Sequence, residues 1–333
     1  MGTLTLVPRH VAASVDELLA GAERRTQMAK HADSLSGSRF ERVSVAGQPC
    51  IVKYLGFEED WLARALGDRD CWALTLWRTG LLDCLPDCID HTILGMAAEA
   101  GGTVAVLMRD VSKSLVSSGS DAMAARDHRQ FLDHMARMHA RFWGFEDRYG
   151  LLGPGARYQA LTPQTGVREQ ARGGADPVPS MLVAMWRALR ASAPEAHDLA
   201  LALVTDPAPL VTALAQTPAT FIHGDWKAGN LGVSPEGRTI LLDWGWPGRA
   251  GPLVDLGWYL AVNCDRLPES KEDTIQGYRR RLEHHGIATA SWFERQLDLA
   301  LLGSFLQLGW SKSGAELQWW LPRIVPVGRE LLA

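Results

Sequence analysis

The sequence lacks several patterns that would each assign the chain to a well-known class. No glycine is followed directly by lysine, so the phosphate loop of P-loop nucleoside triphosphatases is excluded. No Gly-x-Gly-x-x-Gly follows a predicted strand, as a dinucleotide site requires, and the Gly-x-Ser-x-Gly of serine hydrolases is absent. The five cysteines form neither an even framework nor a Cys-x-x-Cys pair, which predicts reduced thiols in a cytoplasmic protein.

Long apolar runs and an excess of positive charge are also missing. No run approaches the roughly 20 apolar residues that span a bilayer, and the amino terminus does not resemble a signal peptide. The formal net charge of -4 gives no electrostatic reason to expect a nucleic-acid partner. With 333 residues, 47% hydrophobic and 22% charged, the chain is long enough for two lobes around a sizeable core, with no membrane attachment expected.

Polar clusters follow two short apolar runs between residues 221 and 245. The first run is Phe221-Ile222 and the second is Thr239 to Leu242. The Gly/Ser/Pro turn from Ser234 to Gly237 is expected to fold the second run back beside the first. Four polar side chains should then converge: His223, Asp225, Asn230 and Asp243.

This set of residues suits phosphoryl transfer. Moving a phosphoryl group from ATP needs one carboxylate to orient the attacking hydroxyl and accept its proton, a role that fits Asp225. An amide and a second carboxylate, here Asn230 and Asp243, would hold magnesium on the phosphates. The alternative is an ordinary hairpin with buried polar residues.

The motif His-x-Asp-x-x-x-x-Asn, followed by Asp-Trp-Gly, resembles the catalytic loop and the Asp-Phe-Gly segment of protein kinases. Its His-Gly-Asp opening is more similar to the aminoglycoside phosphotransferase and choline kinase group, which phosphorylates small molecules. The resemblance implies an α+β, two-lobed, kinase-like fold that uses ATP and Mg²⁺. It implies a helical extension over residues 1–33, a small antiparallel β lobe with a helix over 34–108, and a larger, mainly helical lobe over 109–333.

In the first lobe, residues 14–31 have helical periodicity, and two strands are predicted over 41–45 and 50–55. Lys53 lies within the second strand, where the resemblance implies an anchor for the α- and β-phosphates; an exposed lysine on an edge strand is the alternative. A helix over residues 69–82 would offer Asp70 as its carboxylate partner, with Glu58 or Glu59 as alternatives. The loop before the hairpin is expected to lay backbone N–H groups against phosphates at Ser36, Gly37 and Ser38.

The resemblance implies further roles in the second lobe. The backbone of Arg109 and Val111 would bind adenine after the strand at 103–108, and Lys227 would steady the moving phosphoryl group. His223 and Asp255 would have structural roles, with Asp255 bracing the catalytic loop through backbone N–H groups. Candidate acceptor-binding residues are Trp246, Asp265 and Glu269.

Two further segments carry structural expectations. A helix over 121–143 contains three histidines that we interpret as structural or solvated, and the Gly/Pro-rich residues 163–179 are predicted to form a surface loop or lid.

The expected function is an ATP-dependent phosphotransferase that acts on a small-molecule hydroxyl, with an aminoglycoside or amino sugar as a candidate acceptor. A kinase of a metabolic alcohol, choline-like or sugar, is the alternative acceptor class, and ATP or GTP preference stays open. A protein kinase is disfavoured because no Ala-Pro-Glu segment follows Asp243. A non-catalytic nucleotide-binding regulator predicts loss of a key side chain, yet all four are present: Lys53, Asp225, Asn230 and Asp243.

Overall fold

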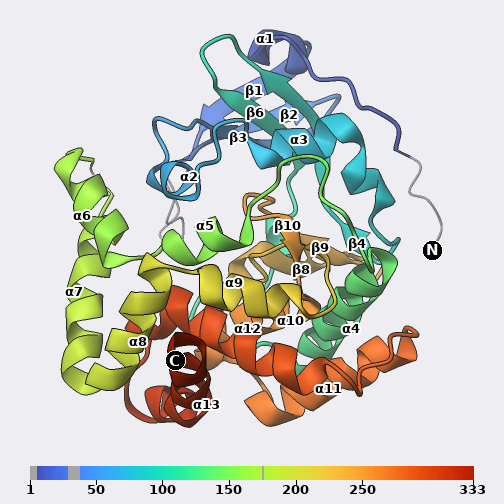
Figure 1. Ribbon diagram of the computed structural model, residues 1–333. Coiled ribbons are helices and arrows are strands. Elements are labelled where there is room, and N and C mark those ends of the chain that lie inside the picture. Colours follow the sequence, from blue (N-terminus) through green and yellow to red (C-terminus); the bar gives the residue numbers. More distant parts are fainter. Residues whose placement is uncertain (1–5, 29–37, 175) are drawn as a thin grey trace. The chain divides into compact units, whose positions relative to one another are not determined.

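The computed structural model describes residues 6–28, 38–174 and 176–333 (Figure 1). The chain divides into two compact units. Unit 1 contains Met1–Ser117 and Gly229–Gly245, and unit 2 contains Ser118–Ala228 and Trp246–Ala333. The Asp-Trp-Gly segment, residues 243–245, belongs to unit 1.

A five-stranded antiparallel sheet forms most of unit 1, in the order β1-β2-β3-β6-β5 (Figure 1). The α+β class of the sequence analysis is confirmed by this sheet and by the mainly helical unit 2. Alternating apolar residues of β2, β3 and β6 pack with α1 into a buried core that includes Val43, Val52 and Leu107. The strands are β1 (Ala22–Gln27), β2 (Arg39–Val45), β3 (Gln48–Leu55), β5 (Ile93–Ala98) and β6 (Val104–Arg109).

Among the described residues of the helix predicted over 14–31, only the first turn is helical, and residues 22–27 form a strand instead. Ser14 caps the short helix α1 (Val15–Leu18), and Gly21, with φ +77°, ends that turn. The chain then forms β1, which pairs with β2 and contains an irregularity between Glu23 and Thr26. Pairing with a sheet edge satisfies the backbone here and outweighs the weak helical periodicity of the sequence.

The helix predicted over 69–82 is shorter than expected. Helix α3 is Trp72–Thr79, and it is preceded by α2 (Trp61–Leu66). Asp68 accepts the backbone N–H of Trp72 at 2.9 Å, which starts α3 only after Asp70. Asp70 is therefore an exposed residue before the helix and does not lie one turn inside it.

A second, smaller sheet of unit 1 has the order β4-β9-β8. Its strands are β4 (Ile89–Asp90), β8 (Leu231–Val233) and β9 (Thr239–Leu241). The turn at 234–237 joins β8 to β9. The prediction that this turn folds the second apolar run back beside the first is therefore wrong. The first run, in β7 (Thr220–Ile222), pairs instead with β10 (Gly248–Ala250) in unit 2.

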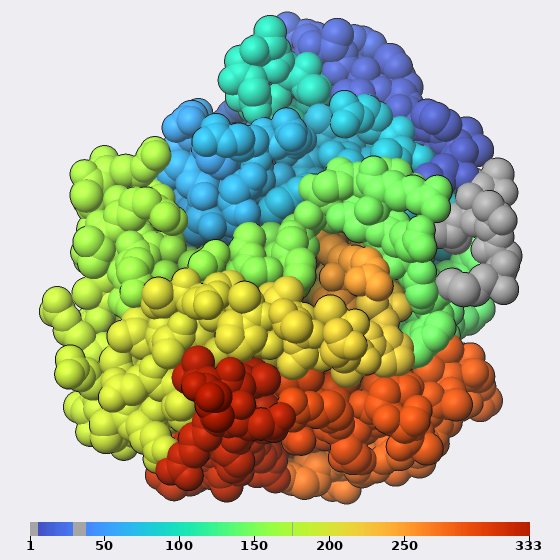
Figure 2. Space-filling model, viewed as in Figure 1, coloured from blue at the N-terminus to red at the C-terminus, as the bar shows by residue number. Residues whose placement is uncertain are grey.

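Unit 2 is mainly helical, with α10 and α12 in contact and α4 against α11. Figure 2 shows α13, in dark red, beside the yellow residues of α8 and α9, which it contacts. The predicted loop at 163–179 is largely helical, because Thr162 caps α6 and two prolines occupy first-turn positions that tolerate them. The helices are α4 (Ala125–Arg141), α5 (Pro154–Gln159), α6 (Pro163–Ala171), α7 (Val178–Ser192), α8 (Pro194–Thr205), α9 (Ala208–Ala215), α10 (Pro252–Val262), α11 (Lys271–His284), α12 (Phe293–Leu308) and α13 (Gly314–Leu332).

Across the described parts of the chain, no single helix has the length and apolar character needed to cross a bilayer. Helices α8 and α9 meet that test only as a pair, bent by 78°.

Candidate functional site

The catalytic loop, which we define as residues 223–228, follows β7 in unit 2. Asp225 in this loop is buried, with 4% of its surface exposed. Its Oδ1 accepts a hydrogen bond from the indole Nε1 of Trp258 at 2.9 Å, and its Oδ2 lies 3.2 Å from Nζ of Lys227. A carboxylate that accepts an indole N–H and faces an ammonium group is held in a fixed orientation, as a proton-accepting residue requires.

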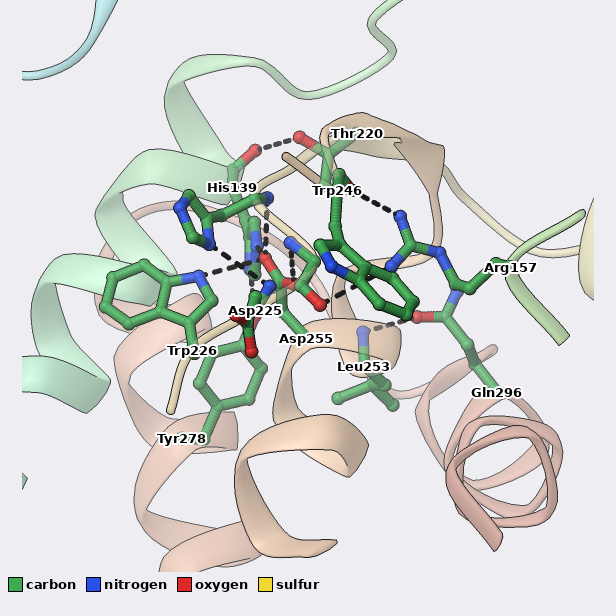
Figure 3. Close-up of polar contacts among 12 residues, drawn as sticks. His139, Arg157, Thr220, Asp225, Trp226, Trp246, Leu253, Asp255, Tyr278 and Gln296 are labelled. Carbon is green, nitrogen blue, oxygen red and sulfur yellow. Dashed lines mark hydrogen bonds and ion pairs between the residues drawn. The ribbon is translucent and has the colours of Figure 1, made fainter. Parts of the chain in front are cut away.

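Asp255, in the first turn of α10, holds the backbone of this loop (Figure 3). It accepts the backbone N–H groups of His223 at 3.0 Å and Gly224 at 2.7 Å, and the indole N–H of Trp226 at 3.0 Å. Burial alone would raise the pKa of Asp255, but the hydrogen bond and charge of His139 lower it below its ordinary value. These contacts are the ones that the expected bracing role requires.

Two histidines complete this network. His139, on α4, contacts Asp255 through Nε2 at 3.0 Å and the hydroxyl of Tyr278 through Nδ1 at 2.6 Å (Figure 3). His223 accepts the backbone N–H of Asp225 on Nδ1 at 3.1 Å. Both rings are fully buried, so they fix the loop from inside unit 2. The sequence analysis interpreted His139 as structural or solvated, and its burial favours the structural role.

Arg157, on α5, is a buried cation that the sequence analysis missed. Its guanidinium donates to the carbonyl of Trp246 at 2.6 Å and to that of Gly224 at 3.5 Å (Figure 3). Gly224 has φ +85°, and an added Cβ there would lie 2.5 Å from this guanidinium. Arg157 therefore ties the catalytic loop to the residue that follows Asp-Trp-Gly.

Asn263, at the end of α10, binds the backbone on both sides of Lys227. Its Oδ1 accepts the N–H of Ala228 at 2.7 Å, and its Nδ2 donates to the carbonyl of Trp226 at 2.9 Å. The sequence analysis also missed this residue and Trp258, because nothing local marks a partner that lies more than 30 residues away. The recurrence of polar and indole side chains along α10 was the one available signal.

In unit 1, the expected phosphate anchor and metal ligand form an ion pair. Nζ of Lys53, on β3, lies 2.7 Å from Oδ1 of Asp243, which follows β9. The Lys53 ammonium also lies 5.9 Å from the ring centre of Phe40. Among the described residues, Lys53 forms its ion pair with Asp243 and not with Asp70, Glu58 or Glu59. Asp70 precedes α3, and Glu58 and Glu59 lie in the turn before α2. Asp243 directly follows the β8–β9 hairpin and lies beside Lys53.

Asp60 is a second carboxylate in this part of unit 1. It caps α2, accepting the backbone N–H of Leu62 at 2.8 Å, and it is buried. Burial raises its pKa, and the positive charge of Lys53 acts in the opposite direction. Asp60 therefore contributes negative charge near Lys53 that the sequence analysis did not identify.

The β8–β9 hairpin brings Asn230 and Asp243 to the same end of one small sheet. Leu231 pairs with Leu241, and the backbone N–H of Leu242 donates to the carbonyl of Asn230 at 2.9 Å. Asp243 follows with φ +63°, a conformation that is costly for a residue with a side chain and is concentrated at functional sites. One amide and one carboxylate fit Mg²⁺, which takes few protein ligands and completes its shell with phosphate and water. Among the described residues, no three His, Cys, Asp or Glu side chains form a metal site.

The other expected nucleotide contacts are placed as follows. Arg109 is the last residue of β6, its backbone N–H donates to the carbonyl of Thr92, and its side chain pairs with Asp90. Val111 accepts the N–H of Ser114 at 2.8 Å. Ser38 is buried, whereas Ser36 and Gly37 lie outside the described residues.

The candidate acceptor-binding residues are placed as follows. Trp246 is 6% exposed, with its ring centre 5.5 Å from that of Trp258, so its ring packs in the core of unit 2, contrary to the expectation of an acceptor-facing side chain. Asp265 is exposed, and Glu269 pairs with Arg129 at 3.4 Å.

Comparisons with known proteins agree with the chemistry of these residues. A family model described as "Phosphotransferase enzyme family" matches residues 60–290, which is more than half of the chain. No curated protein matches the sequence significantly.

Two solved structures illustrate the distance to known relatives. Choline kinase LicA from Streptococcus pneumoniae is 13% identical, with a TM-score of 0.49 over 95% of this chain and 96% of that one. Aminoglycoside phosphotransferase APH(3'')-Id from Streptomyces rimosus, in complex with ADP and streptomycin, is 17% identical, with a TM-score of 0.48 over 88% and 97%.

Proposed function

Since this chain belongs to the phosphotransferase enzyme family, we propose that it transfers the γ-phosphoryl group of ATP to a hydroxyl group of a small molecule. An aminoglycoside or amino sugar is the first candidate acceptor, and a choline-like alcohol or a sugar of metabolism is the second. The observation that supports the proposal most is the Lys53–Asp243 ion pair, which joins side chains 190 residues apart in the sequence. A phosphate anchor and a metal ligand need this proximity to act on one triphosphate.

Each residue of the proposal has a separate task. Asp243 and Asn230 would hold Mg²⁺, and Lys53 would bind the α- and β-phosphates. Magnesium, when bound, supplies positive charge that offsets the charge of the phosphates. Asp225 orients the acceptor hydroxyl and takes its proton as the oxygen bonds to the γ-phosphorus and the bond to the leaving ADP oxygen breaks. Lys227 offsets charge on the moving phosphoryl group.

A coupled assay of ADP release tests the proposal across aminoglycosides, amino sugars, choline-like alcohols and sugars. With an acceptor found, Asp225→Asn should lower turnover by about 10²- to 10⁴-fold, the usual contribution of a positioned base, while ATP binding stays unchanged. Asp198→Asn is a matched control, because this carboxylate is exposed on α8 and outside the site. Unchanged turnover in Asp225→Asn would refute the assigned role. ATP binding without turnover of any acceptor would instead favour a nucleotide-binding regulator.

A further inference from the structure

Trp258 contacts the candidate base directly, and no role in the reaction has been assigned to it so far. Its indole donates to Oδ1 of Asp225, and both residues are buried. We propose that Trp258 is the positioning residue of the reaction: it fixes the Asp225 carboxylate so that Oδ2 is the oxygen that receives the acceptor's proton. This inference rests on the proposed function.

The chemistry of the indole supports this division between the two oxygens. An indole N–H donates but never accepts, so it stabilises the carboxylate at Oδ1 and cannot take part in proton transfer. Oδ2 faces Nζ of Lys227, whose side chain is 32% exposed, whereas that of Asp225 is 5% exposed. Oδ2 therefore lies beside the more exposed of the two groups. Since a carboxylate oxygen has two lone pairs, Oδ2 can face the ammonium and still accept a proton.

Trp258 is itself held rigidly. It lies one turn after Asp255 on α10, and the ring of Trp246 packs against it with the planes tilted by 36°. Helix α10 thus holds the catalytic loop at two points. Asp255 binds the backbone N–H of Gly224, the residue before Asp225, and Trp258 binds the carboxylate of Asp225. Fixing the side chain in this way limits rotation of the carboxylate, and small errors in such an orientation are costly in a positioned reaction.

The test is Trp258→Phe, which keeps an aromatic ring and removes the N–H. We expect kcat to fall by about tenfold to a hundredfold, in line with the loss of a hydrogen bond to a charged group, with KM for ATP and acceptor within about twofold. Trp186→Phe is a matched control, because this buried indole donates to the carbonyl of Leu161 at 3.0 Å, away from the catalytic loop. Its kcat per folded molecule should equal that of the wild type.

A double variant separates positioning from a general structural effect. In an Asp225→Asn background, Trp258→Phe should cause little further loss of the residual rate, because the indole acts through this carboxylate. A wild-type kcat in folded Trp258→Phe, or an equal loss in both backgrounds, would overturn the inference and leave the proposed function standing. A wild type without phosphotransfer to any acceptor would refute the proposed function itself.

If Trp258→Phe does not fold, a spectroscopic measurement takes its place. The indole N–H resonance of Trp258 in ¹⁵N-tryptophan-labelled protein should move markedly between the wild type and Asp225→Asn. An unmoved resonance would contradict the proposed contact.

Discussion

Helix α10 holds the catalytic loop of unit 2, whereas Lys53 and Asp243 of unit 1 form an ion pair with each other. In unit 2, Asp255, Trp258 and Asn263 of α10 and its C-terminal cap bind successive groups of the catalytic loop. In unit 1, Lys53 and Asp243 form one ion pair, and 36% of the Asp243 side chain is exposed. Residues that take no part in the reaction hold the groups that must stay fixed while it proceeds. The groups that must exchange partners are paired with one another.

The largest effect is expected from Asp255→Ala. The change leaves the backbone N–H groups of His223 and Gly224 without their acceptor and removes one of the partners of His139. Breaking such a buried cluster typically costs about 3–5 kcal/mol, so the free energy of unfolding, measured in urea, should fall by about that amount. Asp198→Ala, at an exposed carboxylate of α8, should change it little. A loss as small as that of the control would show that α10 does not hold the loop.

Asn263→Ala should have the next largest effect. It removes the acceptor of the Ala228 N–H and the donor to the Trp226 carbonyl, both buried, at a cost of about 1–3 kcal/mol. Asn263→Asp keeps an acceptor for the Ala228 N–H but has no donor for the Trp226 carbonyl. Comparing the two variants should therefore separate the contributions of the two hydrogen bonds to stability. Hydrogen exchange at the Ala228 amide should quicken in Asn263→Ala alone. Equal exchange in both variants would contradict this assignment.

Lys53→Met tests the other side of the comparison. Because Asp243 is partly exposed to water, removal of the cation should change the free energy of unfolding by at most about 1 kcal/mol. ATP affinity, measured by calorimetry, should fall by about tenfold or more, because a charge-assisted contact to phosphate is lost. A stability loss as large as that of Asp255→Ala would remove the contrast between the two units.

A further contrast between the units concerns pH. Burial raises the pKa of Asp68 in unit 1 from 3.8 to about 7, so the folded state binds a proton that the unfolded state has lost. This contribution to stability therefore falls as pH rises from about 4 to about 7. Asp68→Asn keeps an acceptor for the Trp72 N–H, and it should raise the thermal midpoint at pH 8 with little change at pH 4. An equal shift at both pH values would exclude titration as the cause.

Unit 2 should respond to pH in the opposite direction. Burial lowers the pKa of His128 from 6.5 to about 4, and contacts with His139 lower that of Asp255. As pH falls below about 6.5, the unfolded state binds a proton at His128 before the folded state does, so stability falls on acidification.

Local patterns predicted the parts of the fold whose partners lie close in sequence. Strand-like alternation on either side of Ala46-Gly47 predicted the hairpin of β2 and β3. The apolar run over 103–108 predicted the strand that ends at Arg109. Two predictions were wrong. Residues 22–27 of the predicted helix pair with β2 as a strand, and capping by Thr162 makes residues 163–171 of the predicted loop helical.

The residue types and spacing between His223 and Asp243 by themselves determined the class of chemistry, because phosphoryl transfer needs those groups within a short stretch of chain. Only the tertiary structure decided which residues hold them. Asp243 rather than Asp70 pairs with Lys53, and Arg157, Trp258 and Asn263 secure the catalytic loop. These partners are about 30 to 190 residues apart along the chain, and such contacts depend on how helices and sheets pack, which no local pattern records.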